Sequence, residues 1–409
     1  MRILVIADGR SPITRRWLEG LLTRGHAVSL ISSFPCPPPV FDGTGEGLVF
    51  FRVLPVAFSQ FLGGAGTSSN QPGKNRPVRA VIRRFRGLFL AGRYWLGPLS
   101  VRALASRFAA LVDEAQPDLV HALRIPYEGM LASFTPSGVP LVVSIWGNDL
   151  TLHARGSPWM ADLTRRTLSR ATGLAADARR DLRLGVSWGF AEGKPSLVVP
   201  GSGGIHLEEV ARAPARLPDS VGLRAGENGP LVINPRGLRP GSLRTDTFFK
   251  AVPLVLEQYP GARFICPSMA GQPEAEQWVS TLGLQEHVSL LPTLPQADLW
   301  SIFKCAQVFV SPSVHDGTPN SLLEGMACGC FPVVGDIESM REWIIPGVNG
   351  MLFPADDAQA LAAAVCKGLA DPILRERAAY RNHEIICSRA DSAQVMDQVE
   401  AFYSEVLGR

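Results

Sequence analysis

The stretch SPSVHDGTPNSLLEGMACG, residues 311–329, carries the main evidence for the fold. The apolar and β-branched run VFVSPS predicts a buried strand, and the run SLLEGMA predicts a helix. Asn320 is the expected N-cap of this helix, and Gly329 is its expected C-terminal stop. A strand end that leads into a helix N-terminus presents unpaired backbone N–H groups and the positive end of the helix dipole. We therefore expect an anion-binding site at the loop HDGTPN.

Two carboxylates frame this loop. Asp316 lies where the strand is expected to end, and Glu324 lies one turn into the helix. Because carboxylates repel phosphate, we expect them to accept hydrogen bonds from hydroxyls of a sugar or a ribose next to the phosphates. The loop therefore predicts a site for a nucleotide that carries a polyhydroxylated group. The spacing alone is equally compatible with an ordinary strand–turn–helix that has two solvated acids.

The full string resembles the acidic-x7-Glu signature of the retaining glycosyltransferases of family 4, which have the GT-B fold. Seven residues separate Asp316 from Glu324, and GTPNSLLE followed by MACGCFPVV extends the match. The first acid of that signature is usually Glu, whereas Asp316 is one methylene shorter and changes the reach of the carboxylate. The resemblance covers nearly the whole chain, strongly over residues 305–365 and loosely over the first 210 residues.

Length and composition restrict the class of protein. The 409 residues predict two or three domains, and a formal net charge of only +3 indicates no nucleic-acid partner. Seven scattered cysteines without a CxxC pair predict core residues in a reducing compartment, with no metal site. The opening MRILVIADGR turns polar too early for a signal peptide, and no stretch reaches the ~20 apolar residues of a membrane span. We therefore expect a cytoplasmic protein.

Strand and helix patterns alternate in both halves of the chain, which predicts an α/β protein with two Rossmann-like domains facing each other across a cleft. The loop ADGRSPIT after the first apolar run has only one glycine. It therefore lacks the G-x-G-x-x-G motif that a nicotinamide-dinucleotide site would show. The resemblance implies a C-terminal helix that returns to the first domain. The expected parts are an acceptor-side domain (1–210), a linker (211–228), a nucleotide-sugar-binding domain (229–390) and the returning helix (391–409).

The resemblance also implies which residues bind the donor. Arg236 matches the arginine that follows the first strand of the second domain, and the lysine usually found several residues later has no equivalent. Of the nearby cations Arg239 and Arg244, we choose Arg244, which directly precedes a predicted helix. The alternative is a pair of surface arginines. The expected donor-binding set is Arg236, Arg244, Gly317, Thr318, Pro319, Asn320 and Ser321.

On the acceptor side, the predicted strand PLVVSIWGNDL, residues 140–150, ends in WGND. Many family members have a histidine at this strand end, and here Trp146 takes its place and removes a titratable group. Asp149 is then the better polar residue, and it joins Asp316 and Glu324 in the expected catalytic set. The alternative role of Asp149 is to cap the helix that follows. Where many relatives read P-N-G-V-D, this chain has PGSGGIH, which begins at Pro200.

Residues 74–97 carry seven basic side chains and no acid, with aromatic and aliphatic residues interleaved at roughly helical spacing. One interpretation is a basic amphipathic surface that contacts anionic lipid at the inner face of a membrane. The other is a solvated helix whose apolar side packs on the core.

The resemblance implies a retaining hexosyltransferase that moves a sugar from a nucleotide-diphosphate sugar to a hydroxyl of a glycan, a lipid-linked or polymeric acceptor, or a small molecule, as in polysaccharide biosynthesis. We expect no cofactor, because the nucleotide sugar is a substrate. We expect no metal requirement, because the sequence has no DxD motif at a strand end. Two alternatives stay open: a nucleotide-sugar epimerase of the same fold, and a non-catalytic GT-B-like protein that binds nucleotide sugars.

Overall fold

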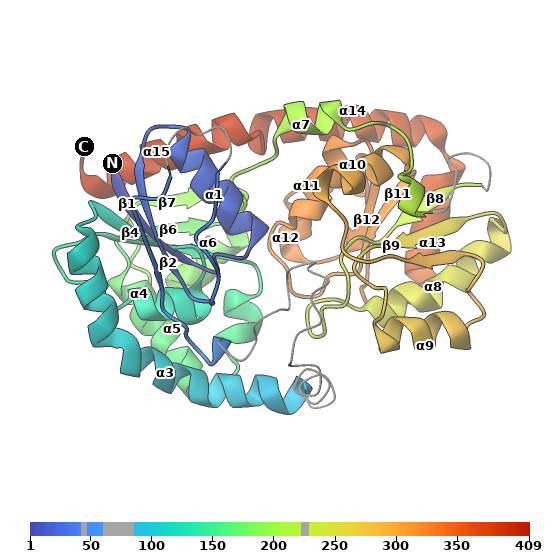
Figure 1. Cartoon of the computed structure of the whole chain (residues 1–409). Coiled ribbons are helices and arrows are strands. Elements are labelled where there is room, and N and C mark those ends of the chain that lie inside the picture. The colour runs from blue at the N-terminus through green and yellow to red at the C-terminus, as the bar shows by residue number, and fades with distance from the viewer. Residues whose placement is uncertain (42–46, 60–85, 222–228) are drawn as a thin grey trace. The chain divides into compact units, whose positions relative to one another are not determined.

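A computed structural model describes residues 1–41, 47–59, 86–221 and 229–409 (Figure 1). The chain divides into two compact units. Unit 1 comprises residues 1–203 and 396–409, and unit 2 comprises residues 204–395. Residues 74–85 of the basic segment and residues 222–228 of the expected linker lie outside the described part of the chain.

Unit 1 is built on a parallel sheet with the strand order β3-β2-β1-β4-β5-β6-β7. Its strands are β1 (Arg2–Ala7), β2 (Ala27–Ser32), β3 (Phe50–Val53), β4 (Leu119–Ala122), β5 (Leu141–Ile145), β6 (Gly173–Ala176) and β7 (Ser196–Val198). Five of the six residues of β1 and all of β5 are buried. This pattern explains the continuous apolar runs in the sequence, because helices cover both faces of a parallel sheet.

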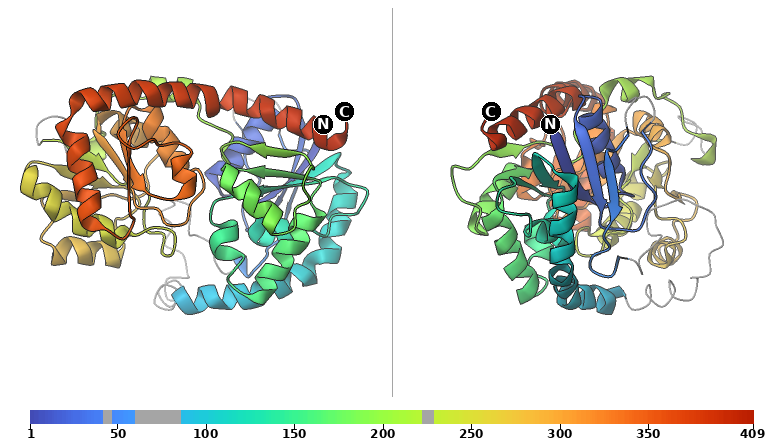
Figure 2. Two further views of the ribbon diagram at one scale, coloured as in Figure 1. Left: turned by 180° about the vertical axis from the view of Figure 1, so that it is seen from behind. Right: turned by 60° about the vertical axis from the view of Figure 1, so that its left-hand side comes forward.

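The helices of unit 1 flank this sheet (Figure 2). They are α1 (Pro12–Leu22), α3 (Arg86–Ala115), the π-helical turn η2 (Ile125–Gly129), α4 (Met130–Ala132), the π-helical turn η3 (Asp149–His153), α5 (Pro158–Arg170), α6 (Arg179–Ser187) and the C-terminal turns of α15 (Ser392–Leu407). Local sequence explains some of their ends. The Ser157 hydroxyl accepts a hydrogen bond from the Met160 amide, and Pro158 occupies the first turn of α5, where its missing N–H costs nothing.

The end of α15 packs against unit 1, as predicted for the C-terminal helix. A buried hydrogen-bond chain fixes it there, since the hydroxyl of Tyr403 bonds Trp17 Nε1 at 3.3 Å and His121 Nδ1 at 2.6 Å. His121 Nε2 lies 2.8 Å from the Ser144 hydroxyl. The two termini lie side by side (Figures 1 and 2), because Asp118 pairs with Arg2 and also with the terminal residue Arg409.

Unit 2 has a second parallel sheet with the order β10-β9-β8-β11-β12-β13. Its strands are β8 (Leu231–Ile233), β9 (Arg263–Cys266), β10 (Val288–Leu290), β11 (Val308–Ser311), β12 (Phe331–Gly335) and β13 (Met351–Phe353). Its helices are α7 (Leu207–Arg212), the 3₁₀ turn η4 (Asp219–Val221), α8 (Thr245–Gln258), α9 (Pro273–Thr281), α10 (Gln296–Cys305), α11 (Asn320–Ala327), α12 (Glu338–Arg341), α13 (Ala358–Ala370) and α14 (Pro372–Arg389).

Each face of the second sheet has its own apolar core. Val308 and Val310 of β11 pack with residues of α8, α9 and α13 on one face, whereas Phe309 packs with α10, α11 and α12 on the other. Two helix-covered parallel sheets confirm the prediction of two Rossmann-like domains.

The central strand–turn–helix forms as predicted, with one difference at the helix start. The helix begins at Asn320 itself, and the extended residue Pro319 precedes it, so Asn320 is the first helical residue and not the N-cap. Proline is suited to this boundary because its φ is fixed near the helical value and it lacks an N–H. Gly329 follows the helix with φ +87°, a left-handed conformation that favours glycine and confirms the predicted stop.

Candidate functional site

Both sheets have a switch point where the strand order reverses, and these points position the polar residues of interest. In unit 2 the switch lies between β8 and β11, and in unit 1 it lies between β1 and β4. Ligands of open α/β sheets bind outside the carboxyl ends of the strands at such points. Arg236 follows β8 and Asp316 follows β11, so the structure brings these two predicted residues together.

Arg236 holds the loop that carries Asp316. Its guanidinium bonds the Asp316 carboxylate and, through Nη1 at 3.2 Å, the Ser321 hydroxyl at the start of α11. The Ser313 hydroxyl donates a further bond of 3.2 Å to Asp316. Only 7% of the Arg236 side chain is exposed, and within the described residues its buried Nε has no acceptor. Part of its donor capacity is therefore available to an oxyanion.

The two cations that the sequence offered beside Arg236, Arg239 and Arg244, have different partners in the structure. The charge of Arg236 lowers the pKa of Arg239 to about 10, while Asp316 acts in the opposite direction, which places Arg239 in the same electrostatic cluster. Arg244 instead directs its guanidinium at Asp246, with bonds of 2.9 and 3.0 Å. Sequence reasoning named both arginines, but the spacing could not show that Arg244 has an acid two residues away as its partner.

The loop of residues 317–319 joins this cluster to α11. The Thr318 hydroxyl accepts a bond of 2.9 Å from Trp343 Nε1, and the Ser339 hydroxyl donates one of 2.7 Å to the Asp316 carbonyl. These bonds fix the loop in front of α11. The first amides of the helix, at Asn320 and Ser321, have no acceptor within the helix because they lie in its first turn. The predicted anion site thus has an arginine on one side and a helix N-terminus on the other.

Glu324 lies in α11, half-buried, and its Oε1 accepts a bond of 2.8 Å from Gln296 Nε2. Asp316 and Glu324 therefore belong to one unit and flank one helix start, whereas Asp149 lies in unit 1.

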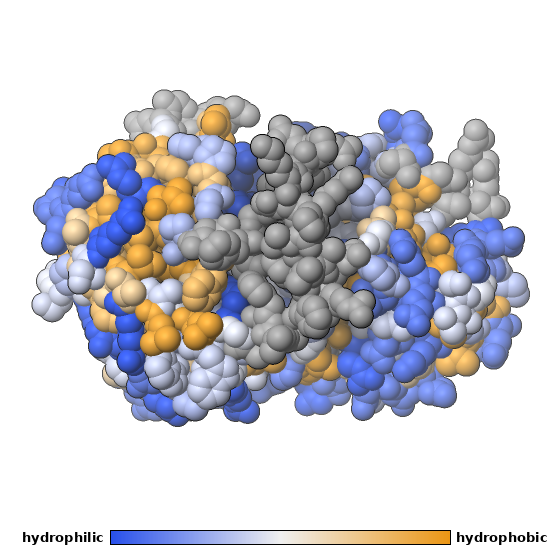
Figure 3. Space-filling model, turned by 60° about the horizontal axis from the view of Figure 1, so that its bottom comes forward, coloured by the Kyte–Doolittle hydropathy of each residue, from blue (hydrophilic) through white to orange (hydrophobic). Residues whose placement is uncertain are grey.

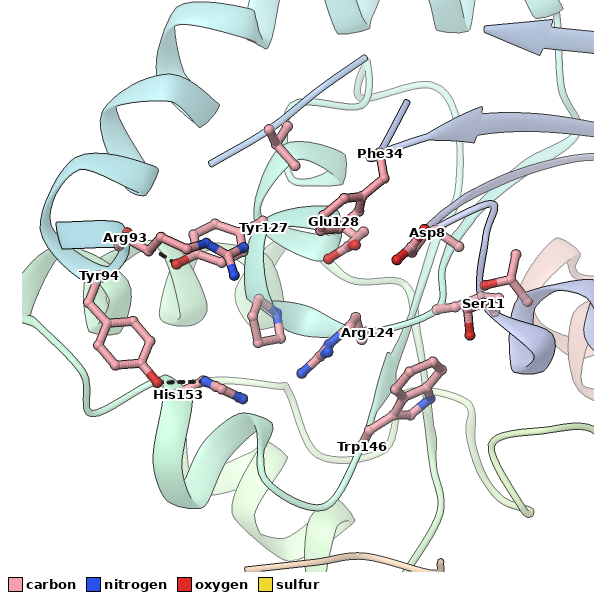
Figure 4. A pocket seen from close by; sticks show the side chains of 15 residues that line it. Asp8, Ser11, Phe34, Arg93, Tyr94, Arg124, Tyr127, Glu128, Trp146 and His153 are labelled. Carbon is pink, nitrogen blue, oxygen red and sulfur yellow. Dashed lines mark hydrogen bonds between the residues drawn. The ribbon is translucent and has the colours of Figure 1, made fainter. Parts of the chain in front are cut away.

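A pocket of about 240 Å³ lies at the carboxyl ends of β1, β4 and β5 in unit 1 (Figure 4). Its lining comes from the strand ends, from α1 and α3, and from η2 and η3. The residues are Ala7, Asp8, Ser11, Thr14, Phe34, Val56, Arg93, Tyr94, Leu123, Arg124, Pro126, Tyr127, Glu128, Trp146 and His153.

Asp149 does not line this pocket. Its carboxylate is fully buried and accepts bonds from Arg124 Nη2 at 2.7 Å and from the Ile125 and Trp146 amides, each at 3.1 Å. The structure therefore gives Asp149 a positioning role, because it ties the end of β5 to Arg124, which does line the pocket. Sequence reasoning missed Arg124, since no spacing connects it with Asp149.

Trp146 lines the pocket where the family usually has a histidine. A Cβ atom at Gly201 would lie 2.9 Å from Trp146 Nε1, so the indole occupies space that only a glycine leaves open. The indole of Trp146 and the glycine at 201 are therefore sterically complementary. The Arg124 guanidinium lies 5.4 Å from the Trp146 ring, a cation–π distance.

Burial shifts the pKa of two further polar groups of the pocket, His153 and Glu128. Burial lowers the pKa of His153 to about 4, with the charges of Arg124 and Arg93 adding to the effect, so His153 is neutral at pH 7 and bonds the Tyr94 hydroxyl at 2.8 Å. Burial also raises the pKa of Glu128, which accepts a bond of 2.6 Å from the Ser33 hydroxyl.

Tyr127 has a left-handed backbone, with φ +68°, although it is neither glycine nor asparagine. Its hydroxyl donates a bond of 3.1 Å to the Arg93 carbonyl, and the Arg93 guanidinium lies 4.8 Å from its ring. Strained backbone of this kind concentrates at functional sites, where the surrounding contacts maintain it. The strain therefore supports a functional role for the pocket.

The described residues contain neither a cluster suited to a metal ion nor a helix suited to span a membrane. Over residues 1–41, 47–59, 86–221 and 229–409, no group of three or more His, Cys, Asp or Glu side chains could hold a metal ion. In the same part of the chain, no helix has the length and apolarity needed to cross a membrane.

Comparisons with known proteins agree with the two-unit architecture. Residues 8–201 match the family model "Glycosyl transferase 4-like domain", and residues 237–371 match "Glycosyl transferases group 1". The chain belongs to glycosyltransferase family 4. The second matched range includes β11 and the whole signature loop from Asp316 to Glu324. This family assignment confirms the resemblance derived from the loop between Asp316 and Glu324.

Individual relatives of this family 4 chain are distant. A phosphatidyl-myo-inositol mannosyltransferase of Mycobacterium leprae is 30% identical over 158 residues, 38% of this chain and 41% of that protein. A lipopolysaccharide core biosynthesis mannosyltransferase of Rhizobium leguminosarum is 26% identical over 172 residues, 40% of this chain and 48% of that protein. The chain thus matches less than half the length of these curated relatives.

A solved structure supports the fold over the full length. HepE of Anabaena, determined in complex with UDP, has a TM-score of 0.70 and 16% sequence identity, and the match covers 99% of this chain and 100% of that one. At this identity the likeness concerns the fold alone. The chain therefore has the GT-B fold.

Proposed function

We propose that the protein is a retaining glycosyltransferase that moves a hexose from a nucleoside-diphosphate sugar to a hydroxyl of an acceptor. The observation that carries this proposal is the position of Arg236, between the signature acid Asp316 and the first amides of α11. An arginine fork and a helix N-terminus are two complementary ways to bind phosphate oxygens. Their meeting at a switch point fits a donor diphosphate.

In this proposal, the positive groups do the electrostatic part of catalysis. Negative charge develops on the diphosphate as the bond to the anomeric carbon breaks, and Arg236, Arg239 and the α11 amides stabilise it. The acceptor hydroxyl forms the new bond to the same carbon, and its proton passes to the oxygen of the departing diphosphate, which becomes basic as the old bond breaks. Asp316 lies near the positive charge that develops on that carbon and accepts from sugar hydroxyls. Glu324 accepts from ribose hydroxyls.

We propose that the reaction needs neither a cofactor nor a metal ion, because arginine side chains supply the charge that a divalent cation supplies elsewhere. Transfer that survives a chelator would support this part of the proposal, and loss of transfer that added Mg²⁺ restores would contradict it.

The donor can be tested directly. Thermal unfolding of the whole chain with UDP-, GDP- and ADP-sugars should show stabilisation by one nucleotide class. Stabilisation by a nucleotide sugar, followed by its consumption only when an acceptor is present, is the expected result. Consumption without an acceptor would indicate an epimerase, and binding without any consumption would indicate a non-catalytic protein.

We also propose that the protein contacts anionic membrane at the inner face of a bilayer through α3, where a lipid-linked or growing polysaccharide acceptor would be found. Trp95, Leu96 and Leu99 in α3 are 52%, 50% and 43% exposed. Figure 3 shows apolar side chains gathered over the face of unit 1 that carries this helix. Exposed tryptophan and leucine beside a basic segment are typical of interfacial helices.

A further inference from the structure

We propose that the pocket of unit 1 recognises an acceptor sugar that carries an oxyanion, either a phosphate or a carboxylate. The inference rests on the proposed function, because it specifies the acceptor class of the same enzyme. It depends on the arrangement of hydrogen-bond donors and acceptors around the pocket.

Three buried N–H groups on the pocket lining have no acceptor in the part of the chain that the structure describes. They are Nε of Arg93, Nε of Arg124 and Nε1 of Trp146. They come from three separate elements: α3, the segment after β4 and the end of β5. Buried polar groups in proteins are almost always paired, so three unpaired donors around one cavity indicate a ligand that accepts hydrogen bonds.

The two arginines converge on one part of the pocket. Both guanidiniums act electrostatically on His153, and Figure 4 shows Arg124 directed into the space between Tyr127, Trp146 and His153. Asp149 balances the charge of Arg124 from outside the pocket lining, so this fork stays in place without a ligand. Planar guanidinium forks match the geometry of carboxylates and phosphates.

The other part of the pocket is suited to hydroxyls. Asp8 and Glu128 lie close together there (Figure 4); Arg10 donates to Asp8, and the Ser33 hydroxyl donates to Glu128. Carboxylates accept hydrogen bonds from sugar hydroxyls and repel anions. A ligand with an oxyanion at the arginines and hydroxyls at Asp8 and Glu128 is an acidic sugar.

The size of the pocket limits the ligand further. About 240 Å³ is below the ~300–1,000 Å³ of pockets that enclose drug-sized ligands. The pocket therefore fits one sugar residue with its anionic group and not an oligosaccharide. The aromatic rings of Phe34, Tyr127 and Trp146 supply the apolar part of its wall.

The test measures the binding of three probes to the whole chain by saturation-transfer NMR: glucose, glucose 6-phosphate and glucuronic acid. We expect at least one anionic probe to bind about tenfold or more tightly than glucose. The phosphate and carboxylate probes distinguish the two possible sources of the oxyanion. Inorganic phosphate should compete with the phosphorylated probe.

Variants connect the binding to the arginines. Arg93→Gln should weaken the binding of the anionic probe about tenfold and leave the binding of glucose unchanged. Removing Arg124 alone would leave the buried carboxylate of Asp149 without its cationic partner, so the double variant Arg124→Gln with Asp149→Asn tests the role of the Arg124 guanidinium. Arg102→Gln is the matched control, because Arg102 also belongs to α3 but pairs with Asp162.

The proposal is overturned if glucose binds as tightly as both anionic probes, if neither anionic probe binds, or if neither arginine variant weakens the preferred probe. Stabilisation by a nucleotide sugar, measured on the same preparations, shows that each variant is folded and tests the proposed function separately. A chain that binds the anionic probe but no nucleotide sugar would contradict the proposed function and leave the pocket assignment standing.

Discussion

Arg236 and Asp316, which are 80 residues apart in the sequence, form an ion pair that joins the end of β8 to the end of β11. The pair connects the signature acid to the arginine proposed to hold the donor diphosphate. The side chain of Asp316 is one methylene shorter than the usual glutamate. Hydrogen bonds from the Arg236 guanidinium and from the Ser313 hydroxyl fix its carboxylate in place.

The first prediction concerns the two signature acids. Asp316→Asn and Glu324→Gln keep the size of each side chain and remove its charge. We expect each to reduce the rate of sugar transfer by on the order of 100-fold, because Asp316 is proposed to lie near the charge that develops on the anomeric carbon and Glu324 to hold the ribose that positions the donor. Steady-state kinetics with the donor found in the thermal screen measures this. Glu274→Gln, an exposed acid of α9, is the control, and normal rates in both site variants would refute the assigned site.

A second prediction separates the two candidate diphosphate cations. Arg239→Gln should weaken donor binding about tenfold, because Arg239 interacts electrostatically with Arg236 and Asp316. Arg244→Gln should change donor binding little, because Arg244 forms an ion pair with Asp246. Calorimetric titration with the nucleotide sugar compares the two. The reverse order would restore Arg244 as the diphosphate ligand.

Gly335 at the end of β12 gives a third prediction. A Cβ atom there would lie 2.2 Å from the Ser313 carbonyl oxygen, so Gly335→Ala must displace the loop that carries Asp316. We expect a loss of about 1–3 kcal/mol in the free energy of unfolding and weaker donor binding. Urea unfolding and donor titration measure the two effects. Gly138→Ala, where nothing lies within 4 Å of the added Cβ, should be nearly neutral. Equal effects of both substitutions would contradict the close approach.

The fourth prediction is a pH dependence of stability at His121. Burial lowers the pKa of His121 to about 3, so the folded chain keeps it neutral where the unfolded chain, with a pKa near 6.5, binds a proton. The unfolded state therefore binds more protons below pH 6.5, and the free energy of unfolding falls as the pH decreases from 6.5 toward 3. This one group contributes at most about 1.4 kcal/mol per pH unit.

Unfolding by urea at pH 7, 6, 5 and 4, compared between the wild type and His121→Gln, isolates this contribution, since all other titrating groups are common to both. The variant should be less stable at pH 7, because Tyr403 and Ser144 lose a partner, and should depend less steeply on pH. Parallel pH profiles of the two proteins would show that His121 does not titrate on unfolding.

A fifth prediction concerns the proposed membrane contact. Replacing Trp95 and Leu96 together by serine should reduce flotation with anionic liposomes at low salt, because it removes apolar side chains that insert into the interface. Ile373→Ser in α14, which is 69% exposed, is the control for a loss of surface apolarity elsewhere. Absence of wild-type flotation at low salt, or equal flotation of all three proteins, would refute the contact.

Local patterns in the sequence determined the architecture and the family. The run from β11 through the loop to the stop at Gly329 could be predicted because strand, turn and helix preferences act over neighbouring residues. The alternation of such units implied two parallel sheets, and the carboxyl end of β11 implied an anion site. The spacing of Asp316 and Glu324 indicated glycosyltransferase family 4.

Only the tertiary structure decided which side chains meet. The partner of Arg236, the influence of Arg236 and Asp316 on Arg239, and the burial of Asp149 beneath Arg124 all depend on how the chain folds. Sequence spacing carries no information about these contacts, because the sheet order brings strand ends together that are far apart in the chain. The pocket of unit 1 exists for the same reason: the crossovers of the sheet collect its donors and acceptors from separate elements at one switch point.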